Sequence, residues 1–140
     1  MRKTVAILSV GSFVVACSFA VLGAQGKASA GVYTAEQATK GEALYKEVCA
    51  ACHGDNLEGS GPMPPLAGGD FLANWNGKTL GDLYEKTQTT MPATAPGTLT
   101  PAQTADVLAF MLKASKYAAG ATALEGKMEA LLPIQIDPPM

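Results

Sequence analysis

Cys49-Ala50-Ala51-Cys52-His53, at residues 49–53, is the stretch of sequence that decides how the rest of the chain is interpreted. Two cysteines three positions apart on a helical turn match the separation of the two vinyl groups of a haem, each of which forms a thioether with a thiol. The histidine that follows is then brought under the iron as its proximal ligand. The spacing therefore predicts covalent attachment of one haem at Cys49 and Cys52, with His53 as an axial ligand.

A thioredoxin-like dithiol, a zinc site and a structural disulfide are the other uses of such cysteines. The dithiol belongs at a helix start within a βαβ unit, whereas this pair falls at the end of a predicted helix. A zinc site needs about four ligands, and the chain beyond residue 30 offers two cysteines and one histidine. A structural disulfide would leave His53 without a role. Haem attachment accounts for all three side chains.

The second axial position cannot be taken by another histidine, because His53 is the only one, so it is left to a methionine, another group, water or nothing. The same count excludes a second haem of this type. Met91 is the favoured ligand, since it follows a predicted helix and precedes Pro92 in a loop able to cross the haem face. Met63 is the next choice, but it lies only ten positions from His53. Met111 falls in an apolar helical stripe, where methionine is usually core filler.

The amino terminus has the pattern of a signal peptide. Arg2 and Lys3 precede an uncharged apolar run from Val5 to Leu22, and Ala28-Ser29-Ala30 supplies a small-x-small cleavage site. We therefore expect a signal peptide over residues 1–30, cleaved after Ala30, with Ala24 as the second choice of site. Export places the protein in the bacterial periplasm, an oxidising compartment where paired cysteines are bridged or otherwise consumed.

Two other readings of this segment stay open. The apolar run is close to the length that spans a bilayer, so it could be retained as an uncleaved anchor. Val14-Val15-Ala16-Cys17 also resembles a lipoprotein box, in which Cys17 would be lipidated, although the residues after it stay apolar. Contact with the membrane is expected only under these two readings.

Composition and charge fit one soluble domain and exclude nucleic acid as a partner. Hydrophobic residues make up 48% of the 140 residues. Removing Arg2, Lys3 and Lys27 with the first thirty residues reduces the basic residues from 10 to 7, against 12 acidic residues, a net charge of −5. A nucleic-acid-binding protein would show the opposite sign. The acidic balance favours protein partners that carry a basic docking patch.

Helical periodicity and capping residues predict an all-α domain with three main helices joined by long Gly/Pro-rich loops. These helices are expected from Thr34 to Gly54, from Thr79 to Met91, and from Thr100 to about Tyr117. Residues 54–77 and 92–99 are expected to be loops. A short helix over 124–132 should lie on the surface, followed by an extended tail. No alternating strand pattern of useful length occurs.

Four segments together resemble the monohaem class I cytochrome c family, and in particular its bacterial periplasmic members. They are residues 49–54 (CAACHG), 64–68 (PPLAG), 91–100 (MPATAPGTLT) and 100–112 (TPAQTADVLAFML). The resemblance covers about residues 35–117, which implies a cytochrome c domain over 31–120 and a carboxy-terminal extension over 121–140. Cytochromes of this kind serve quinoprotein dehydrogenases or terminal oxidases.

The resemblance also implies roles for residues around the haem. The Pro64 carbonyl would accept a hydrogen bond from the His53 ring, and Leu66 would pack on the proximal haem face. Trp75 would lie near the haem edge and propionates, and Tyr45 where the first helix crosses the last. For Trp75 and Tyr45 the simpler reading is packing in the core.

The expected function is reversible one-electron transfer by one covalent haem c. Its partners would be redox proteins such as a periplasmic dehydrogenase, an oxidase or another cytochrome. One alternative is a haem subunit of a larger dehydrogenase or oxidase, docked through the tail after Gly120. Another is a haem sensor with an open iron site, which requires that Met91 is not a ligand. A thiol oxidoreductase would need free reducible cysteines and no haem.

Overall fold

The computed structural model describes residues 26–140, so the amino-terminal charges, the apolar run and Cys17 lie outside the described residues. Within 26–140, no helix is both long enough and apolar enough to cross a membrane. The elements in chain order are β1 (Gly26–Lys27), a short 3₁₀ helix η1 (Ala28–Ala30), α1 (Ala35–Val48), α2 (Ala50–His53), α3 (Gly68–Trp75), α4 (Leu80–Thr90), α5 (Pro101–Ala114), α6 (Met128–Leu131) and β2 (Ile134–Gln135).

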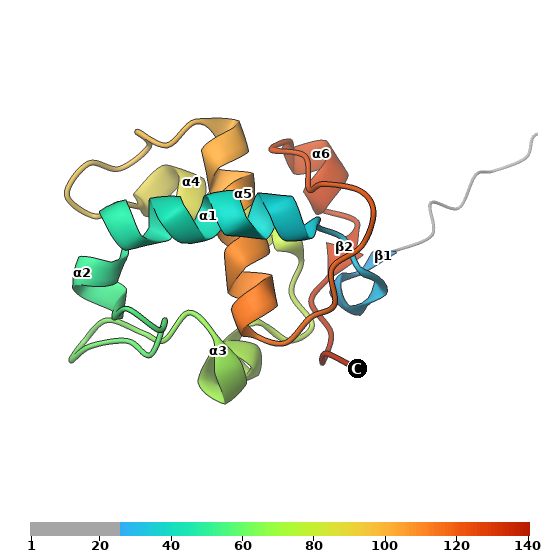
Figure 1. The fold of residues 1–140 in the computed structure, drawn as a ribbon, viewed down its shortest axis with the longest axis horizontal. Helices are drawn as coiled ribbons and strands as arrows, with labels where there is room; N and C mark the ends of the chain where they lie inside the picture. The colour runs from blue at the N-terminus through green and yellow to red at the C-terminus, as the bar shows by residue number, and fades with distance from the viewer. Residues whose placement is uncertain (1–25) are drawn as a thin grey trace, which may run out of the picture.

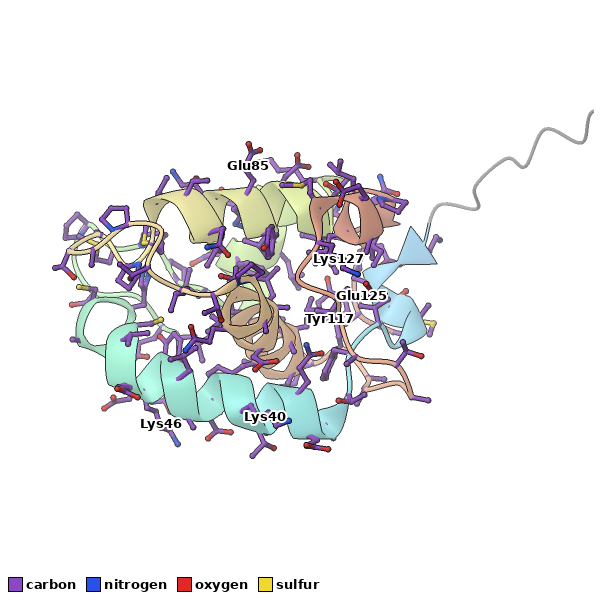
Figure 2. The ribbon with its side chains drawn as sticks, turned by 90° about the horizontal axis from the view of Figure 1, so that it is seen from above. Lys40, Lys46, Glu85, Tyr117, Glu125 and Lys127 are labelled. Carbon is purple, nitrogen blue, oxygen red and sulfur yellow. The ribbon has the colours of Figure 1, made fainter. Side chains whose placement is uncertain are left out.

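The helix α5 lies at the centre of the domain, with α1 on one side and α4 on the other (Figures 1 and 2). Its start is fixed by a capping box in which the Thr100 hydroxyl accepts from the Gln103 N–H and the Gln103 side chain accepts from the Thr100 N–H, with Pro101 at the first position. Thr79 caps α4 in the same way with Asp82. These two starts, and that of α1 after Thr34, were predicted from the sequence and are confirmed.

The helices α1 and α5 cross in direct contact at Gly41. A Cβ atom at this position would overlap the Asp106 backbone carbonyl on α5, so only glycine allows the two backbones to approach this closely. One turn further along α1, the Tyr45 ring packs against Phe110 with 5.3 Å between ring centroids. The crossing fixes the direction of α1 and hence the position of residues 49–53 at its end.

Gly41→Ala is expected to destabilise the fold by about 3 kcal/mol, because the added methyl group must push two helix backbones apart. The matched control is Gly69→Ala in α3, where no atom lies within 4 Å of the added Cβ. That change should alter stability by no more than about 1 kcal/mol, in the stabilising direction. Urea unfolding of both variants measures the difference. Equal midpoints for the two variants would contradict the contact at Gly41.

Two predicted boundaries are wrong. The first helix does not run unbroken to Gly54, because Cys49 departs from helical geometry at φ −119° and separates α1 from α2. Gly54, at φ 80°, ends α2 as expected. The predicted loop 54–77 contains α3, whose sequence begins with two glycines and has weak helix propensity. Phe71 is completely buried, and its burial stabilises this helix although the helix propensity of the sequence is low.

The short helix and extended tail predicted at the carboxy terminus are present, but the helix does not lie on the surface as expected. The helix α6 is shorter than 124–132, and Leu131 and Ile136 are completely buried. The Gln37 side chain donates to the Leu124 carbonyl (2.9 Å) and accepts from the Leu124 N–H (2.8 Å). Buried polar backbone is thus satisfied by a side chain from α1. The segment is therefore an integral part of the core. Figure 1 shows β2, within this segment, beside β1.

The chain before α1 joins this carboxy-terminal segment. The strand β1 pairs in parallel with β2, and Ala28 is completely buried. These two-residue strands were not predicted, since no strand pattern can be recognised over so short a length. The expected end of the signal segment, after Ala30, falls inside this packed region.

Candidate functional site

A pocket lies at the end of the molecule formed by α2 and by loops 54–67 and 91–100, far from β1 and β2 (Figure 1). The volume of the pocket is about 1070 Å³, including the space at its open mouth. Apolar side chains line most of the pocket. Residues from α1, α2, α4 and α5 and from both loops contribute to the walls. The size and lining suit a large, mainly apolar group with one edge open to solvent.

The imidazole of His53 is buried in the pocket wall, at the last residue of α2. Its Nδ1 lies 2.9 Å from the Pro64 carbonyl oxygen. Because a carbonyl only accepts, Nδ1 carries the proton and Nε2 keeps its lone pair for a metal. A hydrogen bond of this kind fixes the ring orientation and strengthens the donation of Nε2 to a bound metal.

Both cysteines line the same pocket and are free thiols. Burial raises the pKa of the Cys49 thiol to about 11, with a smaller contribution from Cys52 beside it. A thiol oxidoreductase needs the opposite, a lowered pKa that provides thiolate near neutral pH. The environment of Cys49 therefore disfavours the dithiol reading. Among residues 26–140, His, Cys, Asp and Glu form no group of three or more that could hold a metal ion.

The thioether of Met91 lines the pocket at the end of α4, together with two other methionines. The backbone N–H of Met91 donates to the Thr87 carbonyl, so the last turn of α4 sets its position. Met63 lies at the mouth and is 38% exposed, whereas Met111 is 1% exposed and belongs to the core as well as to the pocket wall. The sequence did not show that all three would meet in one pocket.

The donor set fits a covalently held haem: two thiols, an imidazole with a free Nε2 and a thioether surround one apolar pocket. The sequence model of the family described as "Cytochrome C oxidase, cbb3-type, subunit III" matches residues 36–111, more than half of the chain. The chain belongs to this family of c-type cytochromes. A c-type cytochrome carries covalently bound haem c with iron and acts as an electron carrier, in some cases as the subunit of an enzyme complex.

The fold of this cytochrome is also found in a solved structure, a chain of the sulfane dehydrogenase SoxCD from Paracoccus pantotrophus. The two chains superpose with a TM-score of 0.51 at 23% sequence identity, over 91% of this chain and 69% of the other. The likeness confirms the mainly helical cytochrome c fold. No curated protein matches the chain.

The residues with roles implied by resemblance separate into two groups in the cytochrome. Pro64, Leu66 and Trp75 line the pocket. The Lys78 ammonium lies 4.8 Å from the centroid of the Trp75 ring, within the range of a cation–π contact. Tyr45 is fully buried outside the pocket lining, and its hydroxyl donates to the Gly54 carbonyl at 2.6 Å. It therefore acts by holding the turn that follows His53.

Sequence reasoning missed several pocket residues of the cytochrome, of which Lys86 is the most informative. It is the only Lys, Arg, Asp or Glu among the lining residues. Helical spacing could have located this part of the pocket lining. Leu83 and Thr87 lie eight and four positions before Met91, on the same face of the helix, and all three line the pocket. Lys86 sits one position away from this row.

Proposed function

We propose that this cytochrome shuttles single electrons between redox proteins of the bacterial periplasm. In this proposal Cys49 and Cys52 hold the haem, and His53 and Met91 are the axial ligands of its iron. The observation that carries the proposal is the meeting of these four side chains in one apolar pocket with an open mouth. Periplasmic location rests on the signal-peptide pattern of the first thirty residues.

The bound haem supplies reversible one-electron oxidation and reduction of its iron. The chain controls the conditions for that step. His53 is oriented by Pro64 and presents Nε2 to the pocket. Met91 supplies a soft thioether, which as an axial ligand favours a higher reduction potential than a second nitrogen donor. If His53 and Met91 both hold the iron, they would leave no position on it open for a substrate, and the pocket would serve electron transfer.

The absorption spectrum of the exported protein tests the proposal. Expression in a host with haem-attachment machinery should give a six-coordinate, low-spin spectrum in the reduced state and a weak methionine-to-iron band in the oxidised state. A high-spin spectrum with carbon monoxide binding would instead indicate a sensor with an open iron site. Absence of haem, while a control cytochrome is loaded in the same host, would reject the function.

Partner docking at the pocket mouth should involve uncharged contacts rather than the net acidic charge. Residues 59–69 and 87–105, which include most of the first loop at the mouth and all of the second, contain no charged side chain. Charged groups instead project from outer helix faces, as Figure 2 shows for Lys40 and Lys46 on α1 and Glu85 on α4. Apart from Lys86, which lines the pocket, the mouth therefore fits a small, short-lived contact with a partner of low local charge. A partner with a basic docking patch would need acidic residues at the mouth. The lining residues include no Asp or Glu.

Thr94→Glu, which adds a carboxylate to an exposed residue at the mouth, is expected to slow electron self-exchange between oxidised and reduced copies about tenfold at low salt. The rate should recover at high salt, where the repulsion is screened. Thr122→Glu adds the same charge to an exposed residue outside the pocket lining and should leave the rate near that of the wild type. Magnetic-resonance line broadening measures the exchange. Equal slowing by both variants would mean that the mouth is not the contact face.

A second candidate is a haem subunit of a larger dehydrogenase or oxidase. It is favoured by the matched family description, which names an oxidase subunit, and by the fold shared with a chain of a sulfane dehydrogenase. The carboxy-terminal segment would not be a free docking tail in such a complex, because Leu131 and Ile136 are buried in the cytochrome itself. Native extraction distinguishes the candidates: the shuttle elutes at the size of the single chain, and the subunit elutes with its enzyme.

A further inference from the structure

We propose that the exported chain is cleaved between Ala24 and Gln25, and that the mature protein keeps residues 26–30 as a brace for its carboxy-terminal segment. The inference rests on the export assumed in the proposed function. By sequence alone Ala28-Ser29-Ala30 is the better cleavage site, because Leu22, three positions before the alternative cut, is not a small residue. The contacts of residues 26–30 in the folded protein decide against it.

The first contact is backbone pairing between β1 and β2. Gly26 is in register with Ile134 and Lys27 with Gln135, in a parallel arrangement. Gly26 also packs closely against Ile134, since a Cβ at position 26 would lie in van der Waals contact, 3.5 Å from the Ile134 side chain. Ile136, the residue that follows β2, is completely buried and belongs to the core. Residues 26–27 thus cover the edge of a strand that leads into the core.

The second contact is a pair of hydrogen bonds between Ser29 and Asp137. The Ser29 N–H donates to one carboxylate oxygen at 2.9 Å, and the Ser29 hydroxyl donates to the other at 2.6 Å. Burial alone would raise the pKa of Asp137, but the two donations from Ser29 outweigh it and hold the pKa below its ordinary value. Tyr117 donates its hydroxyl to the backbone carbonyl of the same residue. Asp137 is therefore held from both sides.

A cut after Ala30 would remove this support. Ala28 is completely buried in the core cluster and Ser29 is 9% exposed, so their loss would open a cavity beside the carboxy-terminal segment. Asp137 would lose both donors while staying partly enclosed. A cut after Ala24 keeps the pairing of β1 with β2 and both hydrogen bonds of Ser29.

Intact mass of the protein exported from the full chain tests the inference. The expected mass is that of a chain starting at Gln25, with or without cyclisation of the terminal glutamine, plus one haem. A chain starting at Gly31, an uncleaved chain, or a chain lipidated at Cys17 would each overturn it. The haem increment in the same spectrum reports the proposed function separately, so failure of one claim is not confused with failure of the other.

Two substitutions at the cleavage sites sharpen the test. Ala24→Asp places a charged residue where a small one is needed and should cause the precursor to accumulate. Ala30→Asp is the matched control, because Ala30 is exposed in the folded protein and should tolerate the change. It should be processed like the wild type. Accumulation of the Ala30→Asp precursor, with normal processing of Ala24→Asp, would place the cut after Ala30 and overturn the inference.

The brace is tested by Ser29→Ala, which keeps the small-x-small pattern and removes only the hydroxyl. Loss of its bond to Asp137 should lower the urea midpoint of the haem-loaded protein. Thr39→Ala removes an exposed hydroxyl on α1 that bonds only within its own helix, and should lower the midpoint less. A midpoint for Ser29→Ala equal to that of the wild type would show that residues 26–30 do not support the fold.

Discussion

Replacing Cys49 and Cys52 together by alanine is expected to yield an exported chain with no covalent haem and little folded structure. Both thiols line the pocket that the haem would fill, and thioethers are the only bonds able to retain the group through unfolding. Without it, the walls from α1, α4 and α5 would enclose a large apolar space, which proteins do not leave empty without a cost in stability. Folding of such a site is coupled to binding of the group that fills it.

The measurement is haem absorbance after denaturation and acidic extraction, combined with circular dichroism of the same sample. More than about nine-tenths of the covalent haem should be lost in the double variant, whereas each single variant keeps one thioether. Ala51→Ser is the control, since residue 51 is exposed between the two cysteines and the spacing is unchanged. Haem that stays with the double variant through denaturation would contradict attachment at these positions.

The sequence predicted the parts of this fold that depend on local chemistry. Thr79 and Thr100 each begin a helix because a hydroxyl beside an amphipathic run satisfies its free N–H groups, and this can be read without any tertiary information. The pentapeptide at 49–53 predicted the cofactor for the same reason, since the chemistry lies within one helical turn. Tyr45 was placed at the crossing of the first and last helices only by family resemblance.

The parts that were missed depend on distant contacts. The helix α3 forms because Phe71 is buried, not because its residues favour a helix. From its sequence alone, the carboxy-terminal segment is predicted to lie on the surface. In the structure Leu124 is hydrogen-bonded to Gln37, 87 positions before it, and Ile136 is buried in the core. The same applies to residues 26–30, whose partner Asp137 stands near the other end of the chain. Local patterns cannot report such pairings.

The pocket shows the same division between local and distant information. His53 and its partner Pro64 are close in sequence, and the hydrogen bond expected between them from family resemblance is present at 2.9 Å. Lys86 and Met111 were not foreseen in the pocket, because they come from α4 and α5 and meet only after the helices pack. The choice among Met63, Met91 and Met111 as ligand therefore needs an experiment on the side chains themselves.

Met91→Ala is expected to remove the methionine-to-iron band and to lower the reduction potential by on the order of 0.1 V. The physical reason is that the thioether stabilises the reduced iron more than a water molecule or an empty position does. The variant should also bind carbon monoxide when reduced, because a position on the iron becomes open. Optical spectra and a redox titration measure the three effects. Met91→His should restore the low-spin spectrum, but at a lower potential than the wild type.

The comparison variants are Met63→Ala and Met140→Ala. Met63 shares the pocket and is the competing ligand, whereas Met140 is completely exposed at the end of the chain. Both should keep the band and the wild-type ligation. If Met63→Ala loses the band and Met91→Ala keeps it, the ligand comes from the loop that carries Pro64, and the chain must cross the pocket within ten residues of His53. If neither variant loses it, buried Met111 becomes the remaining thioether of the pocket, and α5 rather than the loop after α4 would supply the second ligand.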